Sequence, residues 1–149
     1  MNTEYSDDYL TCASTFATLR VFSDELSPDQ ISQALGIEPT KSDTKRVLRV
    51  KGKAHTANRT NGWFYSTNNI VTSDDTRSHL DYIAEVFIPR ASALRALKTH
   101  CEKIDVFCPW ESASGQGGPC ISPHQMKFFA ELEIEVWWEV YFVGDEENV

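Results

Sequence analysis

Two six-residue segments of this chain share a pattern that is typical of helix starts. They are Leu26-Ser27-Pro28-Asp29-Gln30-Ile31 and Ile121-Ser122-Pro123-His124-Gln125-Met126. In each segment the serine can cap a helix, the proline suits its first turn, and the glutamine can bond back to the serine amide. The pattern therefore predicts helices that begin at Pro28 and Pro123. It arises either from an internal duplication or because helix starts converge on these residue types.

Apolar residues after each start predict which helix face is buried. The two predicted stripes are Ile31, Ala34, Leu35 and Met126, Phe129, Ala130. Gly36 can close the first helix in a left-handed conformation. Ser73 is expected to cap a further helical region, and Pro89 to divide that region, because proline lacks a backbone donor and clashes with the preceding turn.

Four further segments have the alternation, or the aromatic and β-branched content, of strands. They are the ranges 12–22, 62–67, 104–110 and 134–142. In the first, Ala17, Leu19 and Val21 share one face, and Phe16, Thr18, Arg20 and Phe22 share the other. In the last, one face carries Ile134, Val136, Trp138, Val140 and Phe142. Together with the helices, these strands predict an α+β fold, a two-layer sandwich of a mostly antiparallel sheet with helices packed on one face.

Charge is unevenly distributed along the chain, whose net charge is −8. The range 41–59, expected to form a strand or hairpin arm, carries seven bases and one acid, whereas 131–149 carries seven acids and no base. An acidic protein repels phosphate, so nucleic-acid binding is not expected.

The length of 149 residues fits one domain, 1–149, with loose tails at 1–12 and 144–149. Because long apolar stretches are missing, we expect a cytoplasmic protein without a membrane partner.

The four cysteines do not follow a disulfide or zinc pattern. They are Cys12, Cys101, Cys108 and Cys120. Their spacing contains no CxxC pair, and nothing in the sequence points to secretion. Reduced thiols are therefore expected, and neither a metal nor a cofactor is predicted.

A set of segments that spans nearly the whole chain is similar to a known family. They are 17–40, Gly62-Trp63, 105–122 and 131–142, and the most specific is the loop Trp110-Glu111-Ser112-Ala113-Ser114-Gly115-Gln116-Gly117-Gly118-Pro119. On these residues the chain resembles the bacterial family known as domain of unknown function 4279. The resemblance implies a small, single-domain, cytoplasmic bacterial protein, and it implies no reaction, cofactor or catalytic residue.

The same loop supplies the first candidate site. Its residues are Trp110, Glu111, Ser112, Ser114, Gly115, Gln116, Gly117 and Gly118. We expect Trp110 to be anchored in the core, and the glycines to let backbone amides approach a ligand in front of a helix. Glu111 and Ser112 would supply polar contacts, and Lys41–Arg59 would fold over them as a basic lid. In the opposing interpretation Glu111 only accepts hydrogen bonds from the loop's own amides.

The second candidate site lies on the last strand. Glu135, Trp137, Glu139 and Tyr141 alternate along its other face. Acids interleaved with aromatic residues suit a basic partner or a sugar-like ligand. Because the sequence contains no catalytic constellation, it favours a non-catalytic protein-binding module with an immunity-like or regulatory role. The alternative is a hydrolase-like enzyme that binds a small molecule through Glu111 and the glycine-rich loop 115–118.

Overall fold

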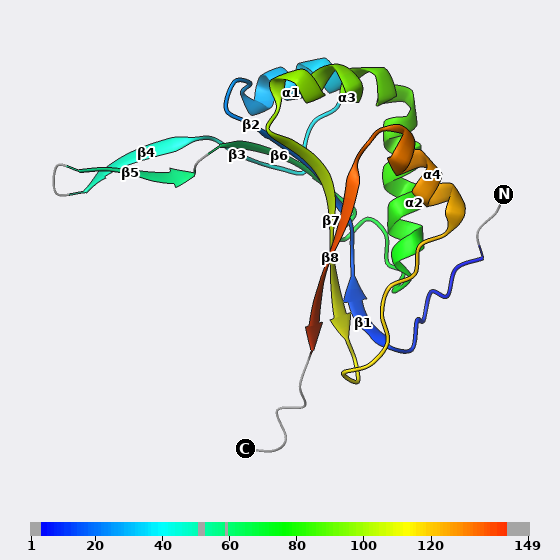
Figure 1. The fold of residues 1–149 in the computed structure, drawn as a ribbon. Helices are drawn as coiled ribbons and strands as arrows, with labels where there is room; N and C mark the ends of the chain where they lie inside the picture. Colours follow the sequence, from blue (N-terminus) through cyan, green and yellow to red (C-terminus); the bar gives the residue numbers. More distant parts are fainter. Residues whose placement is uncertain (1–3, 51–52, 59, 143–149) are drawn as a thin grey trace.

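The computed structural model describes residues 4–50, 53–58 and 60–142 of the chain. The strands are β1 (Cys12–Thr15), β2 (Thr18–Ser23), β3 (Lys41–Asp43), β4 (Arg46–Val50), β5 (Lys53–Asn58), β6 (Asn61–Ser66), β7 (Lys103–Ser112) and β8 (Glu135–Phe142). The α-helices are α1 (Pro28–Leu35), α2 (Thr76–Phe87), α3 (Ala91–Leu97) and α4 (Pro123–Glu131). Short 3-10 turns follow α2 and α3. Figure 1 shows a curled sheet, a helical layer and a separate hairpin.

Strand β7 organises the sheet. On one side it pairs antiparallel with β1 and then with β2, in a register that continues from Thr15↔Trp110 to Thr18↔Phe107. On the other side it pairs parallel with β8. β6 extends the sheet beyond β2, and β3 beyond β6, both in antiparallel register. The sheet is therefore mostly antiparallel and the fold is α+β, as the sequence predicts.

The two predicted helix starts are confirmed. Ser27 caps α1 and Ser122 caps α4, and each serine forms a reciprocal capping box with the glutamine three residues later. Gly36 closes α1 at φ +66°, where glycine has no steric penalty. Pro89 separates α2 from α3 as expected. The cap of α2 was predicted wrongly: it is Asp75, whose carboxylate accepts a hydrogen bond from the Arg77 amide at 3.0 Å.

One hydrophobic core lies between the sheet and the helices. Its fully buried side chains include Leu19 and Val21 of β2, Val106 of β7, and Leu80 and Ile83 of α2. Because α1, α3 and α4 contribute to the same cluster, all four helices of the described chain cover one face of the sheet. The opposite face has no helix over it in the described part of the chain (Figure 1).

Some predicted buried positions are wrong. Ala34 in α1, and Met126 and Ala130 in α4, are exposed. Ser32 and Gln125 are buried instead, because each has hydrogen-bond partners inside the protein. These polar partners come from distant segments, so helical periodicity did not reveal them.

The basic segment and the ends of the chain also differ from expectation. β4 and β5 pair with each other and form a hairpin that projects away from the body (Figure 1). The hairpin and the loop that follows β7 lie far apart, so the hairpin is not a lid on that loop. From Glu4 onward the predicted loose tail is bonded to the body: Tyr5 donates to Asp81, and the Ser6 amide donates to Asp75. The other predicted tail, 144–149, lies outside the described residues.

Candidate functional site

The loop predicted as the first site begins at an anchored tryptophan. Trp110 is fully buried, and its ring meets that of Tyr9 edge-on, with centroids 6.4 Å apart. Glu111 is half-buried at the end of β7, in register with Ser14 on β1 and with Tyr141 on β8. The expected anchoring of Trp110 is present, and it holds Glu111 on the sheet.

Hydrogen bonds within the protein hold the rest of the loop. The Ser112 hydroxyl donates to the Gln116 carbonyl at 2.8 Å, and the Tyr9 hydroxyl donates to the Gly118 carbonyl at 2.9 Å. Gly117 has φ +85°, and a side chain there would collide with Thr11. The loop is therefore shaped by Ser112 and by residues 9–11. Ser114, Gly115 and Gln116 are exposed at its tip.

The histidines of α2 and α4 lie in different environments. His124, in the first turn of α4, lies 3.1 Å from Asp81 on α2. His79 is fully buried between Thr67 and Ser73. The hydroxyl of Ser112, in the glycine-rich loop, donates to the Gln116 carbonyl.

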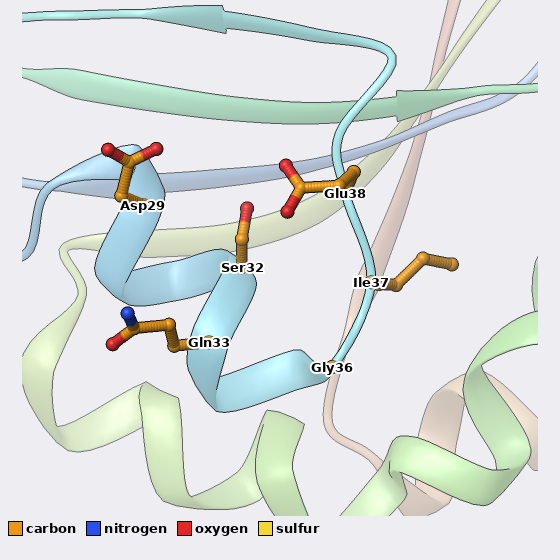
Figure 2. Close-up of a pocket in the computed structure, with 6 residues that line it drawn as sticks. All are labelled: Asp29, Ser32, Gln33, Gly36, Ile37 and Glu38. Atoms are coloured by element: carbon orange, nitrogen blue, oxygen red, sulfur yellow. The ribbon is translucent and has the colours of Figure 1, made fainter.

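A surface hollow of about 450 Å³ lies beside α1. Figure 2 shows the Ser32 and Glu38 side chains turned toward each other, with Asp29 on the preceding turn of α1. The Ser32 hydroxyl already accepts a hydrogen bond from the Trp63 indole at 3.0 Å. A second hollow, of about 480 Å³, lies along residues 6–11 beside the glycine-rich loop. Both hollows are open depressions rather than enclosed cavities.

The second predicted site lies on the uncovered face of the sheet. Glu135, Trp137, Glu139 and Tyr141 are all exposed there, with Trp137 49% and Tyr141 44% accessible. Strand alternation and register place further side chains on the same face: Arg20, Phe22, Phe64, Asp105, Phe107 and Glu111. We call these ten residues, together with Lys103, the open face. They come from four neighbouring strands: β6, β2, β7 and β8.

A buried ion pair lies at the centre of the open face. Asp105 is fully buried, and Arg20 donates to both of its carboxylate oxygens at 2.7 Å. The Lys103 ammonium lies 3.1 Å from the same carboxylate. The Arg20 guanidinium lies 4.6 Å from the centre of the Phe107 ring and 5.4 Å from that of Phe22. Bidentate pairing and stacking on aromatic rings together hold the arginine in one geometry.

The exposed aromatic residues of β8 are also tethered. The Lys103 ammonium lies 4.6 Å from the centre of the Trp137 ring, and the Trp137 indole donates to Glu135 at 2.9 Å. A hydrogen bond to Glu139, together with the negative charge of that carboxylate, raises the pKa of Tyr141. Tyr141 therefore stays protonated at neutral pH and remains a hydrogen-bond donor.

Four of the open-face residues are predicted from the sequence as a partner site, and Glu111 only as part of the loop. Arg20 and Phe22 fall on a predicted strand without a predicted role. The contribution of Phe64, Lys103, Asp105 and Phe107 is not predicted. The sequence signal for these residues is their alternation along each strand with side chains of the opposite face. That signal does not reveal which strands lie next to each other in the sheet.

The cysteines do not converge on a common site. All four are free; Cys12 and Cys108 are buried, and Cys120 is exposed. Burial raises the pKa of Cys12 to about 11, and it also raises the pKa of Cys108. Among the described residues, histidine, cysteine and acidic side chains form no group able to hold a metal ion. Nor does any helix in that part of the chain combine the length and apolar character needed to cross a membrane.

Comparison with known proteins agrees with the resemblance noted in the sequence. The family model described as "Domain of unknown function (DUF4279)" matches residues 13–143. The chain belongs to this family. The match begins at the second residue of β1 and extends beyond the end of β8, so the DUF4279 region includes both the glycine-rich loop and the open face. No curated protein and no solved structure gives a significant match.

Proposed function

We propose that this DUF4279 protein is a non-catalytic module that binds a basic partner protein through its open face. The observation that carries the proposal is the exposure of Trp137 and Tyr141 among carboxylates, on a sheet face without covering helices in the described chain. Large aromatic side chains are enriched among the residues that dominate binding energy at protein interfaces.

The charge of the open face favours a basic partner. Asp105 is already paired with Arg20 and Lys103. The remaining acids of the face, Glu111, Glu135 and Glu139, carry charge that these pairs do not neutralise. A partner with lysine or arginine side chains complements them, and such complementarity accelerates association and selects the partner.

The rigidity of the open face supports a role in recognition. Arg20 is held by two hydrogen bonds and two aromatic rings, and Trp137 is held by Lys103 and Glu135. A surface whose side chains are already ordered loses less conformational entropy on binding. An immunity-like or regulatory role in the bacterial cytoplasm, in which the open face covers part of a target protein, fits this surface.

The test compares capture by three immobilised forms of the full chain, using a lysate of the cells from which the gene comes. They are the wild type, the double variant Trp137→Ala/Glu139→Lys, and Glu85→Lys on the exposed side of α2. Glu85→Lys is the matched control because it changes the charge equally on the helical layer. Captured proteins are identified by mass spectrometry, and each is then purified and titrated by calorimetry.

We expect one basic protein to bind the wild type and Glu85→Lys alike, and to bind the double variant at least tenfold more weakly. Because the attraction is electrostatic, its affinity will fall as salt rises from about 50 to 300 mM. A partner that binds the double variant as tightly as the wild type, or one whose interface is acidic, contradicts the proposal.

A further inference from the structure

Strand β8 is an edge of the sheet. It pairs with β7 in unbroken parallel register, from Asp105↔Glu135 to Ser112↔Phe142. Its other side has no strand partner in the described part of the chain. An edge strand presents a row of backbone N–H and C=O groups that another strand can pair with.

Apart from the charges of Glu135 and Glu139, the edge at β8 lacks the usual protection against strand addition. Residues 135–142 contain no proline, lysine or arginine, and their pairing with β7 contains no bulge. The opposite edge of the same sheet is different, because β3 has only three residues. β8, with eight residues, is long enough to hold an added strand.

Large apolar side chains are exposed on both faces of β8. Trp137 and Tyr141 lie on the open face, and Val140 (43% exposed) and Phe142 (69% exposed) lie on the helix-side face. Val140 and Phe142 share the strand face of Ile134, which is buried. They are exposed because this end of the sheet extends beyond the helices (Figure 1). A strand added to β8 would cover apolar groups on both faces.

The two faces of β8 differ in charge, and this difference specifies the occupant. Glu135 and Glu139 alternate on the open face, whereas Val136, Trp138, Val140 and Phe142 carry no charge on the other. Residues of an added strand lie beside these side chains on the corresponding faces. A complementary strand therefore places basic residues on the open face and apolar residues on the helix-side face.

We propose that β8 binds an extended segment of its partner, with alternating basic and apolar residues, as an additional strand of the sheet. This inference rests on the proposed function, because it takes the partner to be basic and the open face to contact it. Backbone hydrogen bonds to β8 provide the affinity, and the alternation of the partner's side chains provides the specificity.

The test uses a fluorescein-labelled peptide of four Lys-Val repeats, titrated with the full chain and followed by fluorescence anisotropy. Two further peptides are N-methylated on the backbone, one at every lysine and the other at every valine. All lysine N–H groups of a strand point to one edge and all valine N–H groups to the other. Each methylated peptide thus loses the donors of a single edge, while all side-chain charges remain.

We expect the unmethylated peptide to bind, and one methylated peptide to bind at least tenfold more weakly while the other keeps its affinity. A control peptide with four consecutive lysines followed by four valines is expected to bind at least tenfold more weakly. In the protein, Val140→Lys and Glu139→Lys will each weaken binding, whereas Glu85→Lys will not.

The outcomes separate this inference from the proposed function. Equal affinity of the two methylated peptides overturns strand addition. If binding is then lost only in Glu139→Lys, the result still supports electrostatic binding of a basic partner to the open face. A second outcome also overturns the inference: the wild type binds no peptide, and sedimentation shows a dimer that Val140→Lys disrupts. In that case β8 pairs with a second copy of the chain. If neither a peptide nor a basic partner protein binds, both proposals are wrong.

Discussion

At the scale of single residues, His79 shows how burial changes the chemistry of a side chain that looks ordinary in the sequence. Its ring is fully buried in α2, and its Nε2 donates to the Ser73 carbonyl at 2.7 Å. Nδ1 lies 2.6 Å from the Thr67 hydroxyl, which can donate to it. Burial lowers the pKa of His79, because the charged imidazolium would lose its hydration. The neutral ring thus joins α2 to the segment that precedes it, through contacts with Thr67 and with Ser73.

His79 makes stability depend on pH in a defined direction. In the unfolded chain a histidine has a pKa of about 6.5, above that of buried His79, so the unfolded state binds more protons below about pH 7. The free energy of unfolding is therefore expected to decrease as pH falls from 7.5 to 5.5, by up to about 1.4 kcal/mol per pH unit. Urea denaturation at several pH values measures this slope. His79→Gln is expected to flatten it, and an unchanged slope in the variant would rule out His79 as the cause.

At the scale of secondary-structure elements, the two capping boxes show that one local pattern can have different tertiary roles. In α1, the Gln30 side chain accepts a hydrogen bond from the Ser27 amide at the surface. Gln125 makes the same contact in α4 but is 1% exposed, and its amide also donates to the Arg77 carbonyl and to Asp81.

The strands around the two helices also differ in arrangement. In both strand–helix–strand units, β2–α1–β3 and β7–α4–β8, the strand after the helix runs parallel to the strand before it. However, β6 lies between β2 and β3, whereas β7 and β8 are adjacent.

The matched substitutions Gln30→Ala and Gln125→Ala are expected to differ in their effect on stability. Loss of a surface cap contact destabilises by about 1 kcal/mol or less. Gln125→Ala also leaves buried polar groups of α2 without their partner, which raises the expected loss to about 2–4 kcal/mol. Thermal and urea denaturation of both variants measure the difference. Equal losses would show that the bonds from Gln125 to α2 contribute nothing to stability.

At the scale of the whole molecule, the described part of the protein has helices on only one face of its sheet. Helices cover the face of the sheet that contains Trp63, while the open face carries Trp137. The two tryptophans thus occupy opposite environments on strands of the same sheet. Trp63 is fully buried, stacks with Tyr65 and meets Phe87 edge-on.

Alanine substitution of the two tryptophans tests this asymmetry. Trp63→Ala removes a fully buried ring and is expected to destabilise by about 3–5 kcal/mol. Trp137→Ala removes a half-exposed ring and its contact with Lys103, with an expected loss below about 1.5 kcal/mol. Circular dichroism melts of both variants supply the measurement. A loss for Trp137→Ala as large as that for Trp63→Ala would show that the open face is part of a core.

Structural features that depend on neighbouring residues are predictable from the sequence alone. The starts of α1 and α4, the break at Pro89 and the alternation of β8 all follow from contacts within a few residues of chain. Capping, proline geometry and strand alternation act over these short separations, so they can be predicted without knowing the sheet order.

Features that depend on contacts between distant segments become visible only in the folded protein. Arg20 meets Asp105 because β2 and β7 are neighbours, and Gln125 is buried because α4 packs on α2. Val140 and Phe142 share the alternation of Ile134, but they are exposed because the helices end before this part of β8. Alternation specifies which side chains share a face. Whether that face is buried depends on what the rest of the chain packs against it.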